Sequence, residues 1–147
     1  MLVVAAHPES PYTSNRSDCR FPTCYDPSDR DALFQRARSL IDPALERGEH
    51  ILLVGDLNVT QWEPGYRDLA RNLQDAHRQA GWGLGVTWGI YSFGPHSSAN
   101  RQSNAILQLL RIDYMFSSPQ VTPLATSTDC SQRGSDHCIL YGTSAVE

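Results

Sequence analysis

The chain has 147 residues, of which 40% are hydrophobic and 19% charged, a composition typical of a globular protein rather than a disordered one. Its length ordinarily makes one domain, and we take residues 1–147 as one. The net charge of −4, with arginine as the only strongly basic residue type, excludes a strongly basic nucleic-acid footprint. No apolar run approaches the roughly 20 residues of a membrane-spanning helix, so no transmembrane segment is predicted.

The first third of the chain predicts a strand, a loop and a helix. The apolar run 2–6 predicts a buried strand, and the stretch 8–27, rich in Ser, Pro and Asn, predicts a long surface loop. A helix is expected from Ser28 or its neighbour, because apolar residues then recur at helical spacing. Pro43 should kink or stop this helix, and Gly48 should end whatever continues past it.

The middle of the chain predicts a second buried strand and shorter helices. The apolar run 51–54 ends at Gly55 and is the clearest buried strand. After a turn, a helix is expected from about residue 65 to residue 73. Residues 76–80 predict one more helical turn, and the glycines of 81–85 predict a loop.

The last third predicts several strands in succession. Residues 88–104 are polar and are expected to be irregular, whereas 106–117 alternate in polarity and predict one strand. A weaker strand is expected at 121–126 and a final apolar strand at 138–142. Strands separated by one long helical stretch, and then several strands in a row, indicate a mixed α/β layered domain.

The four cysteines leave three interpretations open. Cys19 and Cys24 lie close together in the chain, so a local disulfide is expected if the domain is exported. A four-ligand zinc site that includes Cys130 and Cys138 is an alternative, although no close Cys-x-x-Cys pair is present. Unpaired, partly buried thiols are the third interpretation.

Polar side chains stand at the ends of the apolar strands or within them. In chain order they are His7, Asp56, Asn58, Asp113, Asp136 and His137. Taken singly, a His after a strand or an Asp after a Gly is more often an edge or turn residue. Asp113 differs because burial of an unpaired carboxylate is costly, so it should have an Arg or a functional His beside it. Ser135, Asp136 and His137 are chain neighbours and cannot form the relay of a serine hydrolase.

Four short motifs hold these residues in a fixed order: His7-Pro8, Gly55-Asp56-Leu57-Asn58, Arg111-Ile112-Asp113-Tyr114 and Gly134-Ser135-Asp136-His137. Their ordered combination resembles the C-terminal half of the endonuclease/exonuclease/phosphatase superfamily, which includes DNase-I-like nucleases, sphingomyelinases and inositol-polyphosphate phosphatases. The resemblance runs from His7 to the last strand. It implies a DNase-I-like α/β fold, an α+β layered sandwich of two sheets with helices outside, of which this chain supplies the second half.

The resemblance implies that a phosphodiester or phosphomonoester is hydrolysed by activated water, with Mg²⁺ or Mn²⁺ as cofactor, since hard oxygen ligands suit these ions. His137 would be the base or the electrostatic contact to the phosphate, and Asp113 would hold its tautomer. Asp56 would position or activate the water, and Asn58 would donate a hydrogen bond to the transition-state oxygens. The division of labour between His137 and Asp56 stays open.

The resemblance also implies ligands for the cation and the substrate. Asp136 would bind the metal, directly or through water, together with Asp56 and Asn58. His7 and Arg111 would bind the substrate. His7 would contact the phosphate or protonate the leaving group.

The identity of the substrate stays open between nucleic acid, a phospholipid head group and a small phosphoester. Specificity in this family lies in variable loops, here 10–27 and 89–104. The net negative charge of the chain disfavours duplex DNA as a substrate only slightly, because a bound metal ion supplies local positive charge. Thr87-Trp88 also resembles a segment of bacterial members, some of them attached to membranes. If upstream sequence exists, the expected location is the cytoplasmic or extracytoplasmic face of a bacterial membrane protein.

The chain departs from the family pattern in the N-terminal half, which carries an early Asn and a metal-binding Glu at strand ends. Neither is placed here, since Glu46, Glu49 and Glu63 fall on a helix, its exit and a turn. We therefore expect an N-terminally truncated domain whose incomplete cation site has weak affinity. Apolar strand faces or edges without partners would allow self-association. The alternative function is a non-catalytic fragment with a structural or assembly role.

Overall fold

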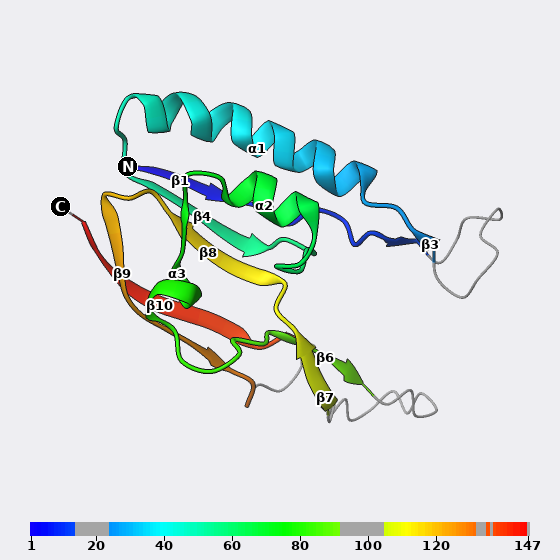
Figure 1. The fold of residues 1–147 in the computed structure, drawn as a ribbon. Helices are drawn as coiled ribbons and strands as arrows, with labels where there is room; N and C mark the ends of the chain where they lie inside the picture. Colours follow the sequence, from blue (N-terminus) through cyan, green and yellow to red (C-terminus); the bar gives the residue numbers. More distant parts are fainter. Residues whose placement is uncertain (14–23, 92–104, 132–134, 136, 147) are drawn as a thin grey trace.

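The computed structural model describes residues 1–13, 24–91, 105–131, 135 and 137–146 (Figure 1). The central element is a sheet of four strands in the order β1-β4-β8-β5. These strands are β1 (Leu2–Ala5), β4 (Ile51–Asp56), β8 (Asp113–Ser117) and β5 (Gln74–Asp75). β1 runs parallel to β4, whereas β8 is antiparallel to both β4 and β5. The predicted strands 2–6 and 51–54 are thus confirmed.

Two helices cover one side of this sheet. Figure 1 shows α1 (Ser28–Glu46) along the sheet, with α2 (Pro64–Ala70) beside it. Apolar residues at helical spacing on α1 pack against alternate residues of β4 and β8, as period 3.6 and period 2 require. The buried core includes Phe34, Ile41, Ile51, Leu53, Leu69, Tyr114 and Phe116. Each large side chain buried here contributes about 1.5–3 kcal/mol by leaving water.

Pro43 does not stop the first helix, which was one of the two effects predicted for it. α1 continues through it to Glu46. A proline in a helix costs one N–H donor, but this one lies in the last turns, and the N–H of Arg47 still donates to its carbonyl. The next residue, Ala44, is fully buried in the core, so packing holds the turn in place. Gly48, with a φ of 69°, ends the helix as predicted.

The segment from Trp88 to Ser117 corrects two predictions. Residues 88–91, expected to be irregular, form β6 (Trp88–Tyr91), which pairs antiparallel with β7 (Ala105–Leu110). The strand expected across 106–117 is divided at Arg111, because β7 pairs with β6 whereas β8 pairs with β4 and β5. Alternating polarity is the same in both pieces, so it gives no sign that the pairing partner changes.

The last two strands form a separate antiparallel hairpin of β9 (Val121–Asp129) and β10 (Ile139–Val146), which confirms the two strands predicted here. Figure 1 shows this hairpin across the sheet from α1, with the short α3 (Ala76–Ala80) between β8 and β9. Two further strands, β2 (Tyr12–Thr13) and β3 (Cys24–Tyr25), pair within the stretch predicted as loop. Among the described residues, no helix has the length and apolar character that crossing a membrane requires.

A disulfide joins Cys130 to Cys138 where the two strands of the hairpin meet the intervening loop. This finding corrects two of the cysteine interpretations, since neither a zinc site nor free thiols can use these sulfurs. The Cys19–Cys24 pairing lies outside the residues that the structure describes.

Candidate active site

Three strands bring polar side chains to one end of the sheet. The parallel strands β1 and β4 end side by side, so His7 and Asp56 meet there. Asp113 begins β8 and lies directly opposite Asp56 in the antiparallel register. His137 precedes β10 and pairs antiparallel with Trp88 at the start of β6. Residues far apart in the sequence therefore share one site.

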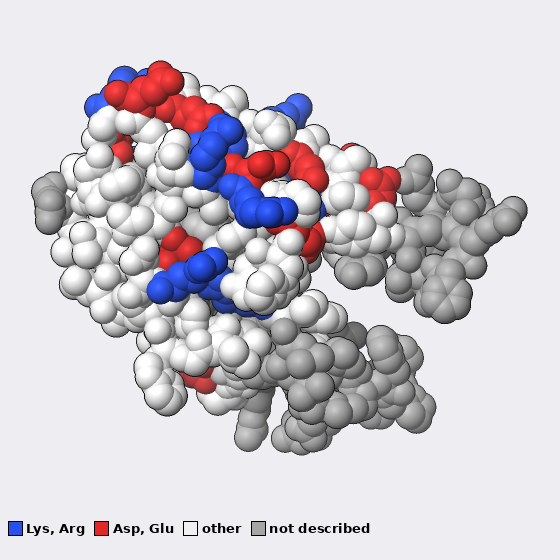
Figure 2. All heavy atoms as spheres, in the orientation of Figure 1, with Lys and Arg blue, Asp and Glu red and all other residues white. Residues whose placement is uncertain are grey.

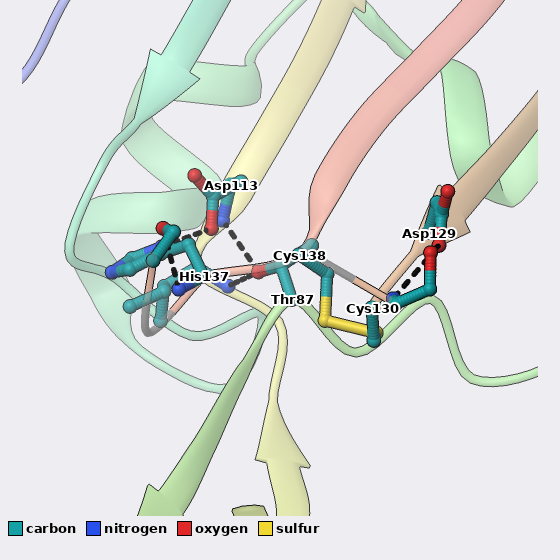
Figure 3. Close-up of a disulfide and its surroundings, with 9 residues drawn as sticks. Thr87, Asp113, Asp129, Cys130, His137 and Cys138 are labelled. Atoms are coloured by element: carbon teal, nitrogen blue, oxygen red, sulfur yellow. Dashed lines mark hydrogen bonds and ion pairs between the residues drawn. A yellow bond between two sulfur atoms is a disulfide. The ribbon is translucent and has the colours of Figure 1, made fainter. Parts of the chain in front are cut away.

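The side chains of Asp56, Asp113 and His137, here called the Asp–Asp–His cluster, offer ligand atoms that all lie within 4.8 Å of one another. His137 Nδ1 is 2.8 Å from Asp113 Oδ2, a contact drawn in Figure 3. The other imidazole nitrogen, Nε2, is 3.7 Å from Asp56 Oδ2. Because an ionised carboxylate only accepts hydrogen bonds, Nδ1 donates to Asp113, whereas Nε2 faces Asp56.

His7 lies at the rim of the cluster. Its Nε2 is 3.5 Å from Asp56 Oδ2, yet its side chain is 76% exposed, against 16% for Asp56. The His7 imidazole is therefore open to solvent and also lies next to the Asp56 carboxylate. It is suited to contact a ligand that enters from solvent.

The turn after β4 orients Asp56 through Asn58. Asn58 has a φ of 47°, and its backbone N–H donates to Asp56 Oδ1 at 2.9 Å. Its side-chain Nδ2 donates to the carbonyl of Pro8 at 3.0 Å. Asn is one of the few residues that adopt this left-handed conformation at small cost. The turn thereby ties the end of β4 to the loop after β1.

The electrostatics of the cluster favour a cation. Burial raises the pKa of Asp56, the N–H of Asn58 opposes this effect, and the nearby charge of Asp113 raises the pKa further. Two carboxylates beside one imidazole leave excess negative charge when both are ionised. Hard carboxylate oxygens at this spacing fit Mg²⁺ or Mn²⁺, so the residues present suit the cofactor that the motifs imply.

A cleft of about 690 Å³ opens beside the cluster, with Asn58 and His137 among its lining residues. Glu63 and Tyr25 also line it, and the tyrosine hydroxyl donates to the Glu63 carboxylate. Arg30, buried beneath them, binds Glu63 Oε2 at 2.7 Å. Burial alone would raise the pKa of Glu63, but hydrogen bonds from Tyr25, Thr60 and Arg30 lower it overall. Sequence reasoning placed Glu63 on a turn and missed its position in this cleft.

Arg111 lies away from the Asp–Asp–His cluster and binds Asp75, so its predicted role in substrate binding stays a prediction that this geometry does not support. Its side chain is buried, and it binds both carboxylate oxygens of Asp75, at 3.0 and 2.6 Å. Tyr66 donates a further hydrogen bond to Asp75. The guanidinium is therefore used in a structural ion pair. The predicted metal ligand Asp136 lies outside the described residues.

The arrangement of sheet, helices and strand-end residues is that of a mixed α/β, DNase-I-like fold, which confirms the fold class predicted from the motifs. The sequence matches the Endonuclease/Exonuclease/phosphatase family over residues 6–137, and the chain belongs to this family.

Solved structures resemble the chain at low sequence identity. A functionally unknown conserved protein from Enterococcus faecalis V583 has 19% identity and a TM-score of 0.66, covering 99% of this chain and 50% of that one. An endonuclease/exonuclease/phosphatase from Bacteroides vulgatus has 19% identity and a TM-score of 0.64, covering 84% and 46%. D. rerio TDP2, complexed with single strand DNA product, has 20% identity and a TM-score of 0.61, covering 98% and 56%.

These likenesses show the fold, and they show that the chain spans about half the length of the structures it matches. A comparison with curated proteins gives no significant match.

Proposed function

We propose that the Asp–Asp–His cluster hydrolyses a phosphoester by means of activated water and a divalent cation. The observation that carries this proposal is the convergence of Asp56, Asp113 and His137 within 4.8 Å. A phosphoester is anionic and repels nucleophiles, so its hydrolysis needs a base for water and positive charge at the phosphoryl oxygens. The cluster offers a base and carboxylates that attract a cation. Membership of the family supports the same reaction class.

The proton chemistry is assigned to His137 and Asp56. Asp113 holds the His137 ring through Nδ1, which leaves Nε2 to take a proton from water or to contact the phosphate. Asp56, within reach of both imidazoles, positions the water. His7 at the rim contacts the phosphate or protonates the leaving oxygen. Asn58 Nδ2, which now donates to the Pro8 carbonyl and at 3.4 Å to Asp56 Oδ2, donates to the transition-state oxygens.

Asp56 and Asn58, with Asp136 as the third ligand, would hold the cation. A bound Mg²⁺ or Mn²⁺ supplies the charge that polarises the phosphoryl oxygen and stabilises the leaving group. The raised pKa of Asp56, caused by burial and by Asp113, supports this placement because a cation would relieve the repulsion between the two carboxylates.

Charge distribution supports a small or single-stranded substrate over duplex nucleic acid. On the face shown in Figure 2, Arg side chains are interspersed with Asp and Glu, and the described residues form no continuous basic stripe there. The described residues that line the cleft are largely apolar, with Glu63 as an ionised group. One similar structure, D. rerio TDP2, is complexed with single strand DNA product. Phospholipid head groups and small phosphoesters fit the same cleft.

We propose further that the chain needs a partner surface, whether the other half of such a domain or a second copy. Ile139 and Tyr141, on one face of β10, are 49% and 53% exposed. Val3 on β1 is 53% exposed, and β1 is an edge strand of the main sheet. Exposed apolar strands of this kind favour association. If the partner is the other half of such a domain, it would supply the Asn and Glu implied by the family pattern, so the isolated site should bind Mg²⁺ only weakly.

The test is hydrolysis of bis(p-nitrophenyl) phosphate and p-nitrophenyl phosphate with Mg²⁺, with Mn²⁺ and with EDTA. We expect cation-dependent hydrolysis that Asp56→Ala and His137→Ala each abolish. His50→Ala is the matched control, since His50 directly precedes β4 and lies at the opposite end of that strand from Asp56. Equal activity in wild type, Asp56→Ala and His137→Ala would contradict the site assignment.

The alternative function is a non-catalytic fragment of the domain. It predicts that Mn²⁺ binding, followed by electron paramagnetic resonance, persists in the wild type while no hydrolysis occurs in any variant. Hydrolysis by the wild-type chain alone excludes it.

A further inference from the structure

Thr87 contacts both backbone segments that bring Asp113 and His137 together. Its side chain is fully buried just before β6. Its Oγ1 accepts hydrogen bonds from the backbone N–H groups of Ile112 at 3.2 Å and of Asp113 at 3.1 Å. Its backbone carbonyl accepts from the N–H of Cys138 at 2.8 Å. Figure 3 shows Thr87 between the start of β8 and the segment that carries His137. One residue thus fixes the backbone under each member of the catalytic pair.

The segment of His137 has a covalent restraint as well. Cys138 forms a disulfide with Cys130, and their Cα atoms are 4.2 Å apart. The disulfide closes the loop 131–137, so His137 is the last residue of that loop and lies directly beside the bond. A closed loop samples fewer conformations than an open one, and the restraint is strongest next to the closure. Figure 3 shows the disulfide and the imidazole on adjoining residues.

We propose that Thr87 and the Cys130–Cys138 disulfide are positioning groups that together hold His137 against Asp113. The hydrogen bond between the two catalytic side chains spans 24 residues of sequence and depends on both backbones staying in register. Thr87 supplies the hydrogen-bonded link between them, and the disulfide limits how far the His137 segment can move away. Neither group touches the reacting atoms.

The disulfide makes this positioning dependent on redox state. A dithiol reduces the Cys130–Cys138 bond by two electrons and two protons, leaving two thiols while the dithiol becomes a cyclic disulfide. Reduction removes the covalent link beside His137, whose segment then keeps only noncovalent contacts, among them those with the Thr87 carbonyl and with Trp88. The expected change in kcat rests on the proposed function. The expected change in the His137 Nδ1–H signal does not depend on any activity.

The first test uses Thr87→Val, which removes the hydroxyl acceptor at nearly constant shape, and Thr87→Ser, which restores it. Ser117→Ala is the matched control, because it likewise removes a buried hydroxyl. Ser117 lies on β8 and donates to the Val121 carbonyl at 2.8 Å. In ¹⁵N-labelled, cation-free protein, we expect the His137 Nδ1–H proton signal in the wild type, Thr87→Ser and Ser117→Ala. The signal should be lost to solvent exchange in Thr87→Val.

The same variants separate positioning from folding in the kinetics. Thr87→Val should lower kcat about tenfold or more, with KM changed less than about twofold, as for other groups that orient a catalytic side chain. Thr87→Ser should recover most of the loss, and Ser117→Ala should keep wild-type kcat. If Ser117→Ala lowers kcat as much as Thr87→Val, general loss of stability explains the effect and the positioning role is wrong.

The second test uses Cys130→Ala/Cys138→Ala and the wild type treated with dithiothreitol. Both should lose the His137 Nδ1–H signal, and the reductant should change nothing further in the double variant, which excludes effects through other cysteines. An intact signal in the double variant overturns the role of the disulfide, and this result is available even if Thr87→Val fails to fold. If the signals behave as expected but no variant or wild type hydrolyses a phosphoester, the positioning role stands and the proposed function fails.

Discussion

Gly55 places the Asp56 carboxylate by having no side chain. It has a φ of 145°, and a Cβ built on it would lie 1.9 Å from the carbonyl oxygen of Ala6. The N–H of Ala6 donates to the carbonyl of Val54 at 3.0 Å, so the two strands are already in close contact here. Only glycine permits this approach, and the approach brings Asp56 to the loop of His7.

Gly55→Ala should therefore destabilise the fold by about 3 kcal/mol or more, because an overpacked backbone contact adds to the strain of positive φ. Gly83→Ala is the matched control, since Gly83 has a φ of 77° but open space around it. Gly83→Ala should lower the free energy of unfolding by about 1 kcal/mol, because only the strain of its positive φ contributes. Urea unfolding of both variants measures the difference. A loss at Gly55 no larger than at Gly83 would show that β1 moves aside readily.

The raised pKa of Asp56 predicts how cation binding depends on pH. In the cation-free protein, burial and then the charge of Asp113 shift this pKa above its ordinary value of 3.8. The protonated form is thus favoured in the folded state, and its stabilising contribution is lost as the pH rises through the shifted pKa. A cation binds only the ionised form, so its affinity should rise over the same interval and level off above it. Mn²⁺ titrations at a series of pH values test this.

Asp56→Asn serves as the control for that titration. It should bind Mn²⁺ more weakly and with a flatter dependence on pH, because the group that exchanges a proton for the cation is gone. An unchanged slope would assign the proton to another residue.

Sequence reasoning anticipated that His7, Asp56, Asp113 and His137 would lie together, because the ordered motifs that hold them resemble one family pattern. It did not foresee where the Arg111 side chain points, since a motif fixes a residue's place in the chain and not the direction of its side chain. Here a buried carboxylate, Asp75, competes for the guanidinium.

At the level of elements, periodicity predicted the helices and most strands but not their boundaries. Pro43 was expected to kink or stop α1, yet the helix continues through it, because the burial of Ala44 outweighs the local preference there. The break between β7 and β8 was missed because it reflects a change of strand partner, which depends on residues distant in the sequence. The register that places Asp113 opposite Asp56 was beyond prediction for the same reason.

The ion pair between Arg111 and Asp75 joins the β7–β8 junction to the start of α3. Arg111→Met should lower the free energy of unfolding by about 3–5 kcal/mol, because it leaves a buried carboxylate without its partner. Arg111→Met/Asp75→Asn should recover part of this loss, since Asn keeps an acceptor for Tyr66 without the charge. Urea unfolding gives both values.

Arg47→Met is the surface control, because the Arg47–Glu49 pair is largely exposed and should contribute less than about 1 kcal/mol. KM should stay unchanged in Arg111→Met if substrate turnover is seen. A raised KM with wild-type stability would restore Arg111 as a substrate-binding residue.

On the scale of the whole molecule, the chain has a packed core on one side of its sheet and exposed apolar strands elsewhere. It spans about half the length of the structures it matches, and residues such as Tyr141 and Val3 lie exposed on strands. The sequence predicted such faces only through resemblance to a longer pattern, because composition does not say which surfaces find partners.

Ile139→Lys and Tyr141→Lys should each reduce concentration-dependent association, because charge on an exposed β-strand disfavours pairing. Leu84→Lys is the matched control, since Leu84 is a highly exposed apolar residue in the loop before β6. Sedimentation velocity across a concentration series measures the effect. Wild-type protein that stays monomeric throughout, or a Leu84→Lys variant that dissociates as fully as the strand variants, would contradict the role of this face.

The parallel pairing of β1 with β4 has a consequence for the order in which the protein folds. Parallel neighbours cannot be joined by a tight turn, and here the connection between β1 and β4 includes the whole of α1. Contacts that close such a long stretch of chain form slowly. When the full-length chain refolds, we therefore expect His7 and Asp56 to become neighbours late, after the residues of the β9–β10 hairpin have paired.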